Sequence, residues 1–198
     1  MGKWFASLYD IGMSGLEKRS FRKIREKLLE NASGRVLEIG SGSGINFPLY
    51  RMAERVDAIE PDPFMIQRSE QRANQAKVPV TVHRQNAQQL EFHDNSFDAV
   101  VATLVFCTIP DPAQALSELK RVSKPGATLL FFEHVKMPQP ALAKLQEILN
   151  PAWRAVCGGC NLNRDTVSEL KRAGIEIEKT ETYYNGLFIT IQCTNNKC

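Results

Sequence analysis

The chain has 198 residues and a formal net charge of +3, with 43% hydrophobic and 24% charged residues. This length suffices for one domain with a substantial core, and the composition is that of a soluble globular protein. The charge is too small to indicate a nucleic-acid partner, and no apolar run is long enough to cross a membrane. Five cysteines and the absence of a secretory signal favour reduced thiols and a cytoplasmic location.

The first predicted element is an amphipathic helix over residues 16–30, in which apolar residues recur at spacings of three and four. Residues 31–34 end it. One interpretation is a helix that packs on a sheet. The other is a lid, or a surface that contacts acidic lipid, because basic residues crowd the segment. These are Lys18, Arg19, Arg22, Lys23, Arg25 and Lys27.

Strand and helix signals alternate through the rest of the chain. The predicted strands are residues 35–39, 56–59, 78–83, 99–104, 127–133, 175–181 and 187–193. The predicted helices are residues 46–53, 64–76, 112–122, 141–149 and 165–173. This alternation indicates an α/β fold with parallel strands and helices on both faces of the sheet. Because no linker or repeat interrupts it, we expect a single domain over residues 1–198.

The most informative stretch is residues 36–44, where an apolar strand runs into Gly40, Gly42 and Gly44. Glycine has no Cβ, so it adopts left-handed backbone angles and lets a ligand approach the main chain. Open α/β sheets hold nucleotide-like ligands at such a strand–loop–helix junction. The third glycine comes one position too early for the dinucleotide fingerprint, and no Gly-Lys-Ser/Thr follows as in a P-loop. A tight turn without a ligand is the alternative.

Polar residues follow the first three predicted strands. Glu38 lies inside the glycine motif, and Glu60 ends the second strand, where a carboxylate can accept both hydroxyls of a ribose. An ordinary exposed carboxylate is the alternative for Glu60, and Asp62 is a second candidate for its role. Asn86 follows the third strand; its amide can read an adenine edge, or it can serve as a turn residue. The pattern indicates a ligand with a ribose and a positively charged group.

In order and spacing, these motifs resemble those of the class I S-adenosylmethionine-dependent methyltransferases, and in particular the methyltransferase type 11 family. The resemblance is carried by residues 38–44, Glu60, residues 97–100 and residues 121–126, and it covers about residues 33–135. It implies a Rossmann-like, doubly wound, seven-stranded sheet that is mostly parallel, with an antiparallel last strand paired to strand six. It also implies S-adenosylmethionine as cofactor.

The resemblance further implies a division of the domain and a set of site residues. A helical cap would span residues 1–32, a cofactor-binding half residues 33–135, and substrate-side helices with a strand hairpin residues 136–198. Tyr9 could close over the cofactor, by analogy with other class I enzymes, or simply pack. Many relatives carry Asp where Asn86 stands, but Asn can still pair with adenine. The cofactor-binding residues would be Glu38, Gly40, Ser41, Gly42, Gly44, Asn46, Glu60, Pro61, Met65, Asn86, Ala87, Thr103 and Leu104.

A narrower resemblance lies downstream. Residues 132–135, 150–153 and 159–164 are similar to the methyltransferase-like alkyl-thiol methyltransferases. Related bacterial enzymes methylate phosphatidylethanolamine. The thiol relatives carry an apolar membrane anchor that this sequence does not show, so we expect a cytoplasmic protein. His134, at the end of the fifth strand, is the candidate general base, and a structural hydrogen bond is its alternative.

The cysteines at positions 157 and 160 form a single C-x-x-C, which is weak evidence for a metal or redox site. Two later cysteines would complete four thiolates, but one of them is the terminal residue. We therefore expect no metal ion, and we favour Cys160 as a pocket-lining residue beside Asn161 and Arg164.

Taken together, the sequence predicts a methyltransferase that acts on a small, lipophilic acceptor through a thiol, amine or carbon nucleophile. No nucleic-acid partner is expected, transient contact with a membrane surface stays open, and so does the oligomeric state. Three alternatives remain: a phospholipid N-methyltransferase at the membrane surface, a non-catalytic cofactor-binding module, and a nicotinamide-dependent oxidoreductase. The position of the third glycine argues against the last.

Overall fold

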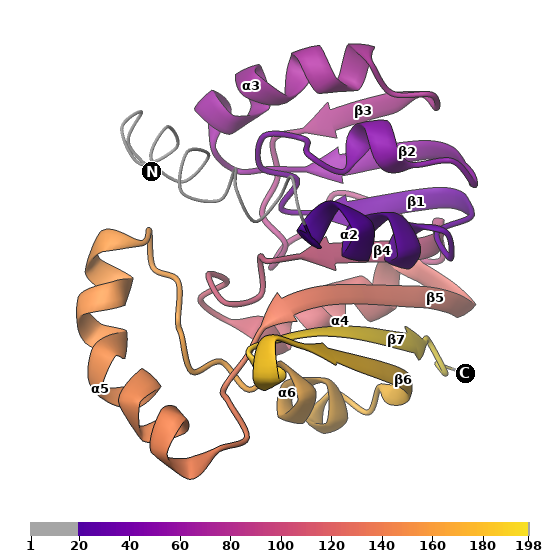
Figure 1. Ribbon diagram of the computed structural model, residues 1–198. Helices are drawn as coiled ribbons and strands as arrows, with labels where there is room; N and C mark the ends of the chain where they lie inside the picture. Colours follow the sequence, from indigo (N-terminus) through magenta and orange to yellow (C-terminus); the bar gives the residue numbers. More distant parts are fainter. Residues whose placement is uncertain (1–19, 198) are drawn as a thin grey trace.

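The computed structural model describes residues 20–197, which contain one seven-stranded sheet (Figure 1). The strand order is β3-β2-β1-β4-β5-β7-β6. Strands β1 to β5 run parallel, and β7 is antiparallel to both β5 and β6. The predicted mostly parallel sheet with an antiparallel last strand is therefore confirmed. The strands are β1 (Gly34–Ile39), β2 (Ala53–Ile59), β3 (Val80–His83), β4 (Phe97–Thr103), β5 (Ser123–His134), β6 (Glu176–Tyr183) and β7 (Phe188–Thr194).

Helices cover both faces of the sheet, and each face has its own apolar core. Side chains of α4 and α6 enter one core, and those of α2 enter the other. Figure 1 shows α5 standing apart, beyond the carboxyl ends of the parallel strands. Within residues 20–197, no helix combines the length and hydropathy that crossing a bilayer requires. The helices are α2 (Arg22–Leu29), α3 (Pro63–Asn74), α4 (Pro112–Val122), α5 (Pro140–Val156) and α6 (Thr166–Arg172), with short 3-10 helices η2 (Phe47–Leu49) and η3 (Tyr184–Gly186).

Three of these helices begin at an aspartate that caps the helix. Asp62, Asp111 and Asp165 each accept a hydrogen bond from a backbone N–H of the first turn. Such caps satisfy donors that have no partner inside the helix. Proline in the first turn of α3 and α4 suits the same position, because its missing N–H would have no partner there. These local signals explain why the predicted starts of α3, α4 and α6 lie within one residue of the observed ones.

The helix predicted over residues 46–53 is wrong. This segment contains only the three-residue η2, and the chain leaves the helical conformation at Tyr50, where φ is −64° and ψ is 126°. The Tyr50 side chain is fully buried, and its hydroxyl donates to Glu38 Oε2 at 2.7 Å. Strand β2 then begins at Ala53. Burial of Tyr50 and the early start of β2 leave no room for a longer helix.

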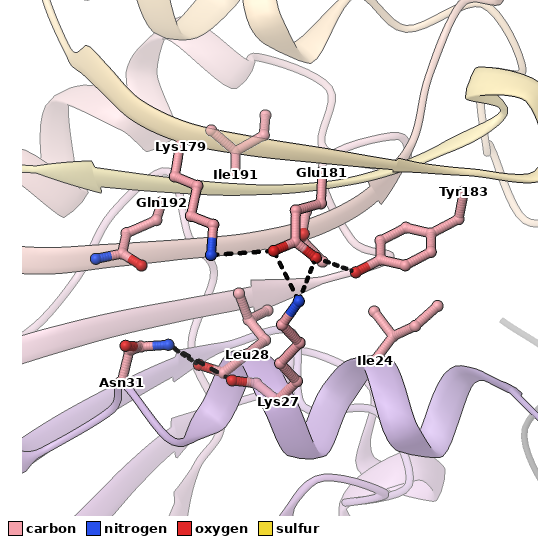
Figure 2. Close-up of a pocket in the computed structure, with 10 residues that line it drawn as sticks. Ile24, Lys27, Leu28, Asn31, Lys179, Glu181, Tyr183, Ile191 and Gln192 are labelled. Atoms are coloured by element: carbon pink, nitrogen blue, oxygen red, sulfur yellow. Dashed lines mark hydrogen bonds and ion pairs between the residues drawn. The ribbon is translucent and has the colours of Figure 1, made fainter.

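Helix α2 packs against the sheet, as in the first of the two interpretations of this segment. Its apolar side chains are buried, and Arg25 among the basic ones turns inward, with only 4% of its surface exposed. Figure 2 shows Lys27 reaching across to Glu181 of β6, with an Nζ–Oε2 distance of 2.6 Å. Both residues of that ion pair line a groove between α2 and the β6–β7 hairpin. Tyr9, Lys18 and Arg19 lie outside the described residues.

Candidate active site

The glycine loop follows β1 and has left-handed backbone angles at all three glycines, with φ of 62°, 55° and 75°. A Cβ added at Gly40 would lie 2.2 Å from Val105 Cγ2, and one at Gly44 would lie 2.6 Å from the Phe47 ring. Within residues 20–197, nothing lies within 4 Å of a Cβ added at Gly42. The outer two glycines are therefore required by packing inside the protein, whereas no residue of the described part of the chain fills the space beside Gly42.

Glu60, the residue after β2, hydrogen-bonds to the middle of this loop. Its Oε2 accepts a hydrogen bond from the Gly42 backbone N–H at 2.9 Å, and its Oε1 accepts one from the Asp62 N–H at 3.0 Å. Burial raises the pKa of Glu60 above its usual value, and the two backbone donors oppose that rise. Beside it, the Ser41 hydroxyl is buried and has no hydrogen-bond partner among residues 20–197. The loop region thus contains the Glu60 carboxylate, which has two backbone donors, and the Ser41 hydroxyl, which has no partner within residues 20–197.

Glu38 lies in β1 inside a fully buried hydrogen-bond network. Asn46 Nδ2 donates to its Oε1 at 3.0 Å, and the Tyr50 hydroxyl donates to its Oε2. Arg25 Nη1 donates to Asn46 Oδ1 at 3.0 Å and to Thr103 Oγ1 at 2.6 Å. Burial raises the pKa of Glu38 to about 7, although the hydrogen bonds from Tyr50 and Asn46 and the charge of Arg25 lower it. Both Glu38 oxygens are therefore engaged within the protein.

Sequence reasoning missed Arg25 as part of this network and grouped it with the basic surface of its helix. The position of Arg25 relative to the apolar residues of its helix could have indicated that it is buried. Arg25 lies next to Ile24 and three residues before Leu28, both of which are buried. At 3.6 residues per turn, that spacing puts Arg25 on the apolar face of α2, toward the sheet.

The residue directly after β4 has a left-handed backbone angle. Leu104 has a φ of 54°, and its N–H donates to the Phe132 carbonyl at 2.7 Å. A left-handed angle at a residue other than glycine costs of order 1–3 kcal/mol, and such strain clusters at functional sites. The next two backbone N–H groups, at Val105 and Phe106, donate to Glu133 Oε1 at 3.0 and 3.1 Å. Glu133, which sequence reasoning did not single out, therefore fixes this turn.

Glu133 is fully buried in β5, and burial raises its pKa to about 7 against the two backbone hydrogen bonds that lower it. Its other oxygen, Oε2, has no hydrogen-bond partner within the described chain. A buried carboxyl with one oxygen engaged and one oxygen open is costly, because an unsatisfied buried polar atom loses its hydration. The turn after β4 and the adjacent end of β5 therefore form a candidate functional region.

The residues expected to surround an adenine lie after β2 and β3. Asn86 is exposed, and its Oδ1 accepts a hydrogen bond from the Gln88 backbone N–H at 3.0 Å, which is a turn interaction. Ala87 and Met65 are buried, with 7% and 6% exposure, and Pro61 is exposed. The turn role considered for Asn86 is thus present in the structure.

His134 ends β5, and its Nε2 lies 3.0 Å from Cys160 Sγ. Cys107 and the Trp153 indole also hydrogen-bond to that sulfur, the latter at 3.2 Å. The hydrogen bond from Cys107, followed by the one from His134, holds the pKa of Cys160 well below its usual range, although burial raises it. Burial lowers the pKa of His134, but the hydrogen bond to Cys160 and the charges of Cys160 and Glu133 together raise it overall.

Cys160 therefore faces Cys107 and His134, and its neighbours in sequence hold the surrounding backbone. Asn161 Nδ2 donates to the Cys107 carbonyl at 2.8 Å, and Arg164 Nη2 donates to the Ile109 carbonyl at 2.8 Å. Sequence reasoning missed Cys107, although its position just beyond the predicted fourth strand was a signal. A buried cysteine there was easily taken for core.

One face of α5 leaves large apolar side chains in solvent near this cluster. Ile148 is 66% exposed, and Trp153, which contacts Cys160, is 40% exposed. Contiguous exposed apolar surface marks ligand, partner or membrane contacts more often than chance. The full set is Leu142, Leu145, Ile148, Leu149, Trp153 and Val156.

Residues 37–131 match the family described as Methyltransferase domain. The chain is 35% identical to the rat protein Thiol S-methyltransferase TMT1B over 178 residues, which cover 81% of this chain and 72% of that protein. It is 30% identical to Phosphatidylethanolamine N-methyltransferase from Cereibacter sphaeroides over 145 residues, or 72% of this chain and 71% of that protein.

Among solved structures, a putative methyltransferase from Bacillus halodurans matches with a TM-score of 0.73 and 16% identity, covering 87% of this chain and 99% of that one. That likeness concerns the fold, and it agrees with the strand order described above. The family is shown by the 35% identity with the rat protein over 81% of this chain. The chain belongs to the class I S-adenosylmethionine-dependent methyltransferases, and its methyl donor is S-adenosylmethionine.

Proposed function

We propose that this protein transfers a methyl group from S-adenosylmethionine to the thiol of a small, lipophilic acceptor. The observation that carries the proposal is the 35% identity with a thiol S-methyltransferase across 81% of the chain. A match of that extent includes His134 at the end of β5 and Cys160 in the segment after it. The acceptor side of the site therefore belongs to the compared region.

The cofactor fits the glycine loop on three observations. Within residues 20–197, no side chain fills the space beside Gly42 and the buried Ser41 hydroxyl has no partner, and Glu60 accepts a hydrogen bond from the Gly42 N–H. An ionised carboxylate offers about four lone-pair positions, so Glu60 can accept ribose hydroxyls while it keeps its two backbone donors. When bound, S-adenosylmethionine supplies an electrophilic methyl group on a positively charged sulfur.

The other expected cofactor residues take different roles in the proposal. Glu38 acts indirectly, because both of its oxygens are engaged; it fixes Asn46 and, through it, Arg25 and Thr103. Asn46 and Thr103 then shape the methionine end together with Leu104. The adenine would lie among Pro61, Met65, Asn86 and Ala87, with the Asn86 amide nitrogen rather than its oxygen facing the base.

The acceptor is proposed to enter between the end of β5 and α5. The exposed apolar side chains of α5 support a lipophilic acceptor, since binding pockets are lined mainly by such groups. A free thiol has a pKa of about 8.5, so it needs less help in losing its proton than an amine or an alcohol. We infer that His134 assists that loss. Correct positioning of the two reactants is worth up to about 7–11 kcal/mol in well-oriented systems.

The test is a methyl-transfer assay on acceptors that share one carbon skeleton and differ only in the nucleophile. We expect turnover of the alkyl thiol and little or none of the matched amine and phenol, with S-adenosylhomocysteine as product. Methylation of the amine alone would contradict the thiol assignment. Binding of S-adenosylhomocysteine without turnover of any acceptor would instead favour a non-catalytic module.

A second candidate is phospholipid N-methylation, which the 30% identity with the phosphatidylethanolamine enzyme favours. Vesicles that contain phosphatidylethanolamine belong in the same assay, beside vesicles of phosphatidylcholine alone. Methylation of the first kind of vesicle at a higher rate than of the alkyl thiol would replace the thiol proposal with this one.

A further inference from the structure

Two cysteines and a histidine from three separate segments meet at the carboxyl edge of the sheet. Cys107 follows β4, His134 ends β5, and Cys160 lies in the loop after α5. We call these three residues the sulfur–imidazole cluster. Their ligand atoms all lie within 4.8 Å of one another. Neither sequence reasoning nor the methyl-transfer proposal uses the three residues as a unit.

The donor set and its spacing suit a zinc ion. Zn²⁺ binds thiolates at about 2.3 Å and imidazole nitrogens at about 2.0–2.1 Å in tetrahedral geometry, which separates two sulfurs by roughly 3.8 Å and a sulfur from a nitrogen by roughly 3.5 Å. His134 Nε2 and Cys160 Sγ are 3.0 Å apart, somewhat closer than an ion would hold them, and all three donor atoms lie within 4.8 Å of one another. Small side-chain rotations would bring the three donors around one ion.

The backbone around the cluster is fixed by other hydrogen bonds. The Asn161 N–H and Nδ2 donate to the Cys107 carbonyl at 2.9 and 2.8 Å, which ties the Cys160 loop to the end of β4. Gln146 of α5 donates from Nε2 to the Val135 carbonyl at 3.1 Å, next to His134. All three ligand-bearing segments are therefore held in place without an ion, and little ordering would be required for binding.

The Trp153 indole and Glu133 favour a bound cation at the cluster, whereas the positive charge of Arg164 nearby opposes one. The Trp153 indole N–H points to Cys160 Sγ, and N–H donors of this kind stabilise metal-bound thiolates and orient the ligand. Glu133 is fully buried beside the cluster, with its Oε2 lacking a partner in the described part of the chain. A divalent cation would offset the charge of two thiolates next to this carboxyl.

We propose that Cys107, His134 and Cys160 bind Zn²⁺ and leave its fourth position for the sulfur of the acceptor thiol. Three protein ligands and one open position are the pattern of catalytic zinc, and a thiol that coordinates zinc is deprotonated. His134 then assists by holding the ion and does not take the proton itself. Ion binding stands independently, whereas the role of the fourth position rests on the proposed thiol methylation.

The chemical step balances. The acceptor thiol loses its proton to solvent on coordination, and its sulfur attacks the methyl carbon. One sulfur–carbon bond forms to the acceptor while the bond from the donor sulfonium to that carbon breaks. The products are a neutral thioether, which leaves the ion, and S-adenosylhomocysteine.

Ion binding is tested on the full chain, reduced and treated with chelator, then titrated with Zn²⁺ or Co²⁺. We expect stoichiometric metal after gel filtration, and thiolate-to-cobalt charge-transfer absorption in the near ultraviolet. Cys160→Ser and Cys107→Ser should each weaken binding at least roughly tenfold. Cys157→Ser and Cys193→Ser are the matched controls and should bind as the parent does. Circular dichroism verifies that each variant is folded.

Absence of retained metal in the parent protein would overturn the site, as would equal affinity in the Cys160→Ser and Cys157→Ser variants. A Cys107–Cys160 disulfide in protein kept under reducing conditions, detected by peptide mass, would overturn it too. The catalytic role has its own measurement, the rate of thiol methylation with and without the ion. Equal rates would overturn that role and leave the metal site standing. Metal binding without methylation of any acceptor would identify the proposed function as the part that failed.

Discussion

The two ends of the site are built in opposite ways. At the cofactor end, Glu38, Asn46, Arg25 and Thr103 engage one another in a buried network. At the acceptor end, Glu133 Oε2 and His134 Nδ1 are buried without partners within residues 20–197, and α5 exposes its apolar side chains. The Ser41 hydroxyl of the cofactor loop is also without a partner within residues 20–197, but the network around Glu38 is formed before any ligand binds, which suits a cofactor that does not vary. An acceptor region with open polar atoms and exposed apolar surface is completed by what binds there.

The largest effect is expected at Gly42. Gly42→Val fills the open space that borders the loop, so the Kd for S-adenosylhomocysteine should rise by two orders of magnitude or more. Gly126→Val is the matched control, because Gly126 also has a positive φ and open space around an added Cβ but lies near the start of β5. Both variants carry strain of about 1–2 kcal/mol or more. Equal binding losses, measured by calorimetry, would mean that the space at Gly42 is not a ligand site.

Arg25→Met should break the finished network at the cofactor end. Removing one partner of a buried charged group leaves the other uncompensated, so we expect the free energy of unfolding to fall by about 3 kcal/mol. The loss should be larger above the pKa of Glu38, about 7, than below it, because only the ionised carboxylate needs the guanidinium.

Lys23→Met is the control for Arg25→Met, since Lys23 is exposed on the same helix. Its unfolding free energy, from urea titration, should change by no more than about 0.5 kcal/mol. Equal losses of unfolding free energy in Arg25→Met and Lys23→Met would mean that the buried network does not stabilise this region.

Glu60→Ala should weaken binding of S-adenosylhomocysteine by about 1–3 kcal/mol, the range for lost hydrogen bonds to a charged group. Glu91→Ala, at an exposed position, is the control and should bind as the parent does. Because Glu60 also holds the Gly42 and Asp62 N–H groups, the free energy of unfolding is measured in parallel. An unchanged Kd would contradict the ribose role even if stability fell.

The pH dependence of stability compares the two ends directly. Burial raises the pKa of Glu38 and of Glu133 from about 4.5 to about 7, so the folded protein holds more protons than the unfolded chain in this window. The free energy of unfolding should therefore be highest below the lower value and should fall as pH rises through about 7. Glu38→Gln and Glu133→Gln should each flatten part of that slope. A stability that rises over this window would contradict both assignments.

The smallest effect is expected on α5. Ile148→Gln should change the free energy of unfolding by less than about 0.5 kcal/mol, because Ile148 is 66% exposed. Leu119 of α4 is fully buried, so Leu119→Ala should lower the free energy of unfolding by about 2–5 kcal/mol and serves as the comparison. A large loss in Ile148→Gln would mean that this face of α5 is covered within the protein.

Much of the fold could be predicted because its signals are local. The alternation of apolar strand and helix patterns indicated where the elements lie, and α4 was predicted at its observed residues 112–122. The capping aspartates and first-turn prolines seen in the structure are local signals of the same kind. The helix expected at 46–53 failed because the burial of Tyr50 against Glu38 is a tertiary interaction. The same distinction holds for the candidate site, where the glycine loop and Glu60 follow directly from strand ends.

The sequence by itself determined the order of elements, the glycine loop and the acidic residue after β2, because backbone geometry and short-range spacing encode them. Only the tertiary structure decided that Arg25 meets Thr103, 78 residues away, and that Cys107, His134 and Cys160 converge. Such meetings depend on how helices and loops pack over the carboxyl edge of the sheet. Packing of that kind sums many weak contacts between distant residues, and no local pattern records which side chains it brings together.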